Sequence, residues 1–201
     1  MKGYYFITDC LLSRAGNAAD VKAAVAAGVE AIQYRNKCAR SKTLYEEALS
    51  LKKLCRGAQF IVNDRVDIAL AVDAAGVHLG QEDMPPGAAR RLLGTRRIIG
   101  VTVHDEAQAR RAQRLGADYL GVSPVFPTRT KPDAGEAQGV ALIRRIRKCV
   151  RIPVVAIGGI TLVNAPLVIA AGADALCAIS AVVTKADVKA EIRKFQALFN
   201  K

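Results

Sequence analysis

The sequence predicts a single domain, residues 1–201, that folds as a closed (β/α)8 TIM barrel of the α/β class. Short runs rich in Val, Ile and Tyr alternate with stretches rich in Ala, Leu, Lys and Arg that have helical spacing. This alternation favours parallel strand pairing, and the nearly continuous apolar strands indicate that both faces of the sheet are covered. An open doubly wound sheet is the alternative, but no G-x-G-x-x-G fingerprint follows the first strand.

Eight expected strands follow one another along the chain. They are residues 4–9, 31–36, 59–64, 76–80, 98–103, 118–124, 153–159 and 175–180. Helical spacing occurs between them, for example over residues 20–27, 41–55 and 105–115. Several of these helices close with a small-residue turn such as AGVE at residues 27–30, where glycine suits the left-handed position that ends a helix.

The net charge of +12 raises the question of a nucleic-acid partner. Most arginines lie in blocks spaced like the polar face of an amphipathic helix, such as residues 89–93, 109–114 and 144–148. Stacking side chains are scarce, with five Phe, five Tyr and no Trp. We therefore expect solvated helix faces and small anionic substrates, and no nucleic-acid partner.

Other features bear on location and association. No apolar run approaches the roughly 18 residues that a membrane span needs, and the start of the chain is typical of a strand and not of a signal peptide. The five cysteines form no C-x-x-C pair, which argues against a disulfide framework and a zinc site. We expect a cytoplasmic protein with reduced thiols and no membrane partner; the sequence leaves a homo-oligomer open.

Polar residues gather where the expected strands end, which is where a (β/α)8 barrel builds its active site. The second to fourth strands end near Arg35, Asp64 and Asp83, and the fifth ends near Thr102 and His104. The sixth runs into PTRTK at residues 127–131, whose hydroxyls and ammonium can donate hydrogen bonds to an anion. His78, inside the fourth strand, is expected to be an interior residue with satisfied hydrogen bonds.

Six segments together resemble the thiamine-phosphate synthase family: ITD (7–9), QYRNK (33–37), NDRVDIAL (63–70), GVHLGQEDMP (76–85), PVFPTRTK (124–131) and AIGGI (156–160). Their joint occurrence, in order and at compatible spacing, is specific. The resemblance implies a (β/α)8 transferase that joins a hydroxymethylpyrimidine pyrophosphate to a thiazole phosphate. The products would be thiamine phosphate and pyrophosphate, with Mg²⁺ as the cofactor.

The resemblance also implies site residues. Residues 33–37 would hold the pyrimidine pyrophosphate, residues 128–130 would contact the thiazole phosphate, and Lys131 would reach the pyrophosphate. Arg35, Thr102 and Lys131 are the expected catalytic residues. The expected substrate-binding residues are Gln33, Tyr34, Arg35, Asn36, Lys37, Asn63, Thr102, His104, Thr128, Arg129, Thr130, Lys131, Gly159, Ile179 and Ser180.

The reaction makes two demands that the residues can meet. Departure of pyrophosphate develops negative charge, so the site needs a metal and fixed cations. Asp64 and Asp83, at the ends of adjacent strands, suit Mg²⁺, which takes one or two carboxylates and completes its shell with water and phosphate oxygens. Arg35 and Lys37 are two residues apart on an extended segment and can point to the same side.

The alternative function is a thiazole tautomerase-like isomerase on the same barrel. Tautomerases of this kind use groups at the barrel rim for proton transfer, and His104 would be the candidate here. These relatives generally lack the complete PTxTK segment, which this chain keeps at residues 127–131. The synthase is therefore the favoured interpretation.

Overall fold

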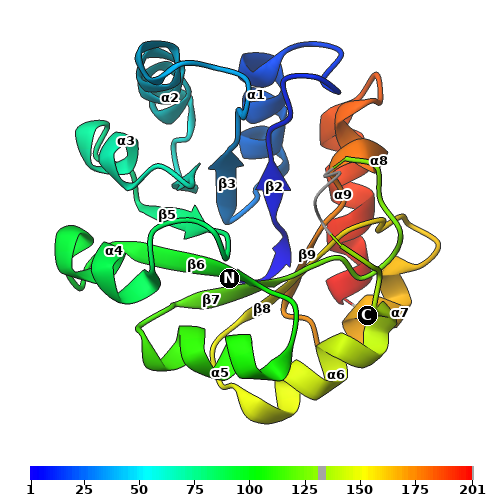
Figure 1. The fold of residues 1–201 in the computed structure, drawn as a ribbon. Helices are drawn as coiled ribbons and strands as arrows, with labels where there is room; N and C mark the ends of the chain where they lie inside the picture. Colours follow the sequence, from blue (N-terminus) through cyan, green and yellow to red (C-terminus); the bar gives the residue numbers. More distant parts are fainter. Residues whose placement is uncertain (131–134, 201) are drawn as a thin grey trace.

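The computed structural model describes residues 1–130 and 135–200, in which parallel strands form a barrel and helices surround it (Figure 1). The strands are β1 (Gly3–Tyr4), β2 (Phe6–Ile7), β3 (Ala31–Tyr34), β4 (Gln59–Asn63), β5 (Gly76–Leu79), β6 (Ile98–Val103), β7 (Tyr119–Val122), β8 (Val154–Ile157) and β9 (Ala175–Cys177). The helices are α1 (Asn17–Ala27), α2 (Ser41–Leu54), α3 (Val66–Ala71), α4 (Pro86–Leu93), α5 (Glu106–Arg114), α6 (Gly139–Cys149), α7 (Ala165–Ala170), α8 (Ile179–Val183) and α9 (Val188–Ala197), followed by the 3-10 helix η1 (Leu198–Asn200).

The barrel closes through its first strand, which Tyr5 divides into β1 and β2. β1 pairs in parallel with β9, and β2 pairs in parallel with β3. The Tyr5 amide continues the β9 side by donating to the Leu176 carbonyl oxygen at 2.8 Å. The strand order therefore returns on itself as β1-β9-β8-β7-β6-β5-β4-β3-β2. The predicted closed barrel is confirmed, and the open-sheet alternative is wrong.

Local signals set several helix ends. The Asp105 side chain caps α5 by accepting a hydrogen bond from the Gln108 amide. Gly28 ends α1 in the left-handed conformation, with φ of 79°. Some expected strands are longer than the observed ones. The last strand is expected over residues 175–180, but β9 ends at Cys177 and α8 begins at Ile179.

Apolar side chains fill two separate layers because successive residues of a strand point to opposite faces. Tyr4 and Phe6 pack outward in the layer between strands and helices, whereas Tyr5 and Ile7 pack inside the barrel with Tyr119. Full burial of each large apolar side chain contributes about 1.5–3 kcal/mol. These two packed layers hold the strand ends in place.

None of the helices in residues 1–130 and 135–200 is long and apolar enough to cross a membrane.

Candidate active site

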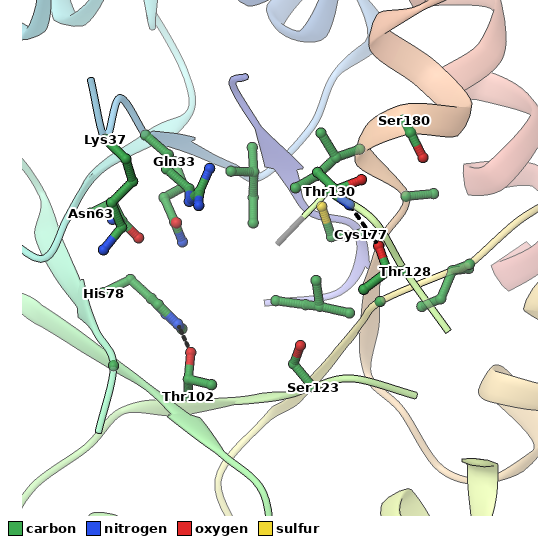
Figure 2. Close-up of a pocket in the computed structure, with 18 of the residues that line it drawn as sticks. Gln33, Lys37, Asn63, His78, Thr102, Ser123, Thr128, Thr130, Cys177 and Ser180 are labelled. Atoms are coloured by element: carbon green, nitrogen blue, oxygen red, sulfur yellow. Dashed lines mark hydrogen bonds between the residues drawn. The ribbon is translucent and has the colours of Figure 1, made fainter. Parts of the chain in front are cut away.

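A cavity lies at the carboxyl ends of the barrel strands, where the sequence places its polar residues (Figure 2). Twelve of the expected site residues line it: Gln33, Arg35, Lys37, Asn63, Asp64, Asp83, Thr102, Thr128, Thr130, Gly159, Ile179 and Ser180. They come from loops and strand ends that are far apart in the sequence. The closed sheet brings them together.

Cationic side chains lie on the β3 side of the cavity. Gln33, Lys37 and Asn63 are grouped on one side in Figure 2. The Arg35 guanidinium lies 3.8 Å from the Asp9 carboxylate, and the Lys37 ammonium lies 2.5 Å from Asp64. These two cations are 19% and 50% exposed, so both remain accessible to an anion in the cavity.

Two carboxylates approach each other beside Lys37. Asp64 follows β4 with a positive φ of 62°, and its amide donates to the His78 carbonyl oxygen at 2.8 Å. The Asp83 carboxylate accepts a hydrogen bond from the Gly80 amide at 2.7 Å. Burial raises the pKa of Asp64, the neighbouring Asp83 carboxyl raises it further, and Lys37 opposes both effects. Two carboxyl groups therefore lie next to one protein cation, Lys37.

Hydroxyls and a tight backbone turn form the opposite wall. Figure 2 shows Thr128, Thr130 and Ser180 across the cavity from Lys37. The Thr130 amide donates to Thr128 Oγ1 at 3.2 Å. Gly159 has φ of +61°, and a Cβ there would lie 2.4 Å from the Pro127 carbonyl oxygen. Only glycine lets these two loops approach so closely.

The structure places Tyr34 and Asn36 outside this cavity. The Tyr34 ring stacks on Phe60 with centroids 6.5 Å apart, and its hydroxyl donates to Glu47 at 2.5 Å. The Asn36 amide nitrogen also donates to Glu47, at 3.0 Å. Strand alternation explains the placement of Tyr34, which ends β3 and points away from the face that carries Gln33. Asn36 follows the strand, and its bond to Glu47 holds it outside the cavity.

His104 and Arg129 are also not among the residues that line the cavity. The His104 ring donates from Nδ1 to the Ser123 carbonyl oxygen at 2.5 Å, so it is engaged with the backbone of the next strand end. His104 therefore does not line this cavity, and its expected contact with the substrate stays a prediction. Lys131, the remaining predicted site residue, lies outside the described residues.

Further lining residues were not expected at the site. They include His78, Ser123, Ile157 and Cys177. His78 is 4% exposed and hydrogen-bonded to Tyr119 and Thr102, which confirms it as a satisfied interior residue. It nevertheless reaches the cavity. His78 lies between Val77 and Leu79, which pack in the outer layer, and this alternation of apolar residues is the sequence signal that could have shown its inward direction.

Comparison with known proteins identifies the family. The sequence profile of the thiamine monophosphate synthase family matches residues 4–182. The chain belongs to this family. It is an enzyme of the transferase class of thiamine-phosphate synthases.

Individual relatives agree with this assignment. The thiamine-phosphate synthase of Methanosarcina mazei is 51% identical over 193 residues, 96% of this chain and 80% of the relative. That of Chloroflexus aurantiacus is 51% identical over 197 residues, 96% of this chain and 91% of the relative. A thiamine phosphate pyrophosphorylase structure from Pyrococcus furiosus superimposes with a TM-score of 0.90 at 42% identity, covering 98% of this chain and 95% of that one.

Proposed function

We propose that this enzyme condenses 4-amino-2-methyl-5-hydroxymethylpyrimidine pyrophosphate with hydroxyethylthiazole phosphate, forming thiamine phosphate and pyrophosphate with Mg²⁺ as cofactor. One observation carries the proposal beyond the family assignment: two polar walls of different chemistry face each other across one cavity. Cations and carboxylates form one wall, and hydroxyls with a glycine turn form the other. Two phosphorylated substrates can thus lie side by side.

The pyrophosphate would lie on the cationic wall. Arg35 and Lys37 supply fixed positive charge, and Asn63 and Thr102 supply neutral donors beside them. Lys131 would add a further positive charge to the pyrophosphate site. The thiazole phosphate would bind across the cavity at Thr128, Thr130 and the Gly159 turn, where backbone amides can approach it closely.

Asp64 and Asp83 would hold the Mg²⁺. Both carboxylates line the same cavity, an arrangement that fits a divalent cation. Among the described residues, no group of three His, Cys, Asp or Glu side chains could hold a metal. Two carboxylates nevertheless suffice for Mg²⁺, which commonly keeps water and substrate oxygens as its other ligands. When bound, the ion would neutralise charge on the departing pyrophosphate.

The protein's own part in the reaction is alignment and charge stabilisation. Arg35 and Lys37 would stabilise the leaving pyrophosphate as the bond to the pyrimidine methylene carbon breaks. The cavity walls would hold the thiazole nitrogen close to that carbon. The reaction between two substrates would then proceed as an effectively unimolecular step within one complex. A dissociative substitution of this kind requires no protein nucleophile.

The tautomerase-like alternative is less well supported. Its candidate proton-transfer group, His104, donates to the Ser123 carbonyl oxygen and does not line the cavity. Relatives at about half identity carry the synthase name.

Metal dependence tests the proposal. Thiamine phosphate formation would be measured against Mg²⁺ concentration for the wild type, Asp83→Asn and a control, Asp67→Asn. Asp67 is an exposed aspartate paired with Arg65 outside the cavity. We expect EDTA to abolish wild-type activity and Asp83→Asn to require more Mg²⁺, with Asp67→Asn unchanged. Activity that persists in EDTA, or equal Mg²⁺ curves for both variants, would contradict the metal assignment.

A further inference from the structure

Five polar side chains form a continuous hydrogen-bonded network inside the barrel. In order, this interior network consists of Gln33, Tyr5, Tyr119, His78 and Thr102. Gln33 Nε2 lies 3.0 Å from the Tyr5 hydroxyl, and the two tyrosine hydroxyls are 2.7 Å apart. His78 lies 2.8 Å from Tyr119 through Nδ1 and 2.8 Å from Thr102 through Nε2, the second contact being drawn in Figure 2. All five are buried, with Thr102 the most exposed at 8%.

The two ends of the interior network line the cavity, whereas its two tyrosines do not. Tyr5 and Tyr119 come from opposite parts of the chain and meet in the barrel interior, with ring centroids 5.7 Å apart. They therefore connect Gln33 to His78 and Thr102 without reaching the substrates themselves. Any effect they have on the reaction must act through these partners.

Two glycines make room for the network. A Cβ at Gly100 would lie 2.1 Å from Tyr119 Cζ, and one at Gly121 would lie 2.9 Å from His78 Cε1. Neither glycine has a positive φ, so conformation does not require glycine at these positions. The absence of a side chain serves the packing of the two rings.

The hydrogens of the network can be assigned in one direction. Gln33 Nε2 donates to the Tyr5 oxygen. Either tyrosine hydroxyl could donate in the 2.7 Å contact between them, but since Tyr5 already accepts from Gln33, we assign its single hydroxyl hydrogen to the Tyr119 oxygen. A tyrosine hydroxyl is protonated at neutral pH, so Tyr119, which accepts from Tyr5, is assigned as the donor to Nδ1 of His78. The imidazole hydrogen is then on Nε2, which donates to Thr102 Oγ1.

We propose that Tyr5, Tyr119 and His78 are positioning residues that fix the hydrogen-bond polarity at both ends of the interior network. Gln33 is held with its amide oxygen available to accept from the amino group of a pyrimidine. Thr102, which accepts from His78, is left to donate its own hydrogen to a pyrophosphate oxygen. The reverse direction would offer an amide NH2 and a hydroxyl lone pair, which suit neither group. The substrate identities rest on the proposed function; the direction of the network does not.

The tautomer of His78 tests the direction without substrates. Protein labelled with ¹⁵N-histidine would be studied by NMR, and a His104→Gln variant would assign the signals because the chain has two histidines. We expect the Nε2–H tautomer at His78, with Nδ1 as an acceptor, and a shift of the Nδ1 signal in Tyr119→Phe. An Nδ1–H tautomer or a doubly protonated ring in the wild type would overturn the proposal.

Kinetics test the positioning role. Tyr119→Phe keeps the ring beside Gly100 and removes the central hydroxyl. The matched control is Tyr4→Phe, because Tyr4 is equally buried and donates to the Ala178 carbonyl oxygen outside the network. Without the Tyr119 hydroxyl, Gln33 and Thr102 are less well oriented toward the pyrimidine pyrophosphate. We expect a loss equivalent to about one hydrogen bond, so that kcat/KM for this substrate falls about tenfold in Tyr119→Phe. KM for the thiazole phosphate should stay within about twofold of the wild-type value.

Equal kcat/KM in the folded Tyr119→Phe and Tyr4→Phe variants would overturn the positioning role. Wild-type protein with no synthase activity would count against the proposed function instead. In that case the tautomer of His78 would still decide the direction of the interior network.

Discussion

Replacing Gly159 with alanine should loosen the wall that we assign to the thiazole phosphate. The residue has φ of +61°, and the added Cβ would lie 2.4 Å from the Pro127 carbonyl oxygen and 2.8 Å from Phe126 Cβ. Two costs combine. An L side chain at positive φ costs about 1–2 kcal/mol, and overpacking typically costs about 1–3 kcal/mol. The free energy of unfolding should therefore fall by about 2–5 kcal/mol.

A second glycine separates these two costs. Gly28 has φ of +79°, and no atom lies within 4 Å of the place that an added methyl group would take. Gly28→Ala should therefore lose only the conformational part, about 1–2 kcal/mol. Urea unfolding of the wild type and both variants would give the free energies, with a constant m-value as the check that the transition remains comparable.

Activity provides the functional part of the same test. The chain that Gly159→Ala displaces leads directly into Thr128, so KM for the thiazole phosphate should rise while KM for the pyrimidine pyrophosphate stays nearly unchanged. Gly28→Ala should leave both values unaltered, since Gly28 ends α1 away from the cavity. If Gly159→Ala lost no more stability than Gly28→Ala and kept its KM values, the packing argument would be refuted.

Three further predictions concern single side chains. Asp20 is buried with Oδ2 lacking a hydrogen-bond partner, and burial raises its pKa in the folded state, so its ionisation removes stability as pH rises through that pKa. Asp20→Asn should be more stable than the wild type by about 1 kcal/mol at neutral pH, with the gain vanishing in acid; urea melts at both pH values that show no difference would contradict this. Arg35→Gln should raise KM for the pyrimidine pyrophosphate about 10- to 100-fold through loss of a charged hydrogen bond, and unchanged steady-state kinetics would remove Arg35 from the site. Cys38 is exposed and Cys177 is buried, and burial also raises the pKa of the Cys177 thiol, so pulse alkylation followed by mass spectrometry should label Cys38 in the folded protein and Cys177 only after unfolding; equal labelling would be inconsistent with the fold.

The strand ends could be predicted from the sequence because parallel strands alternate with helices, and polar residues follow the strands on one rim. The same period-two alternation separates Gln33 from Tyr34 within β3, whereas residues 35–37 follow the strand. The QYRNK motif alone places all five residues at the site. The bonds of Tyr34 and Asn36 to Glu47, which hold both residues outside the cavity, have no signal in the motif.

Other features depend on the three-dimensional structure. Residues 4–9 look like one continuous strand, and the division at Tyr5 appears only when the barrel closes against β9 and β3. His104 follows Thr102 by two residues, but β6 ends at Val103 and Asp105 caps α5, so the alternation no longer applies to it. The contact between Tyr5 and Tyr119 joins residues 114 positions apart, which no local pattern indicates.

The proposed synthase activity can be measured directly as the complete reaction with purified protein. Hydroxymethylpyrimidine pyrophosphate, hydroxyethylthiazole phosphate and Mg²⁺ would be combined, with each component omitted in turn, and thiamine phosphate and pyrophosphate would both be quantified. We expect equal amounts of the two products only in the complete mixture. Absence of thiamine phosphate, with both substrates shown to be intact, would contradict the proposed function.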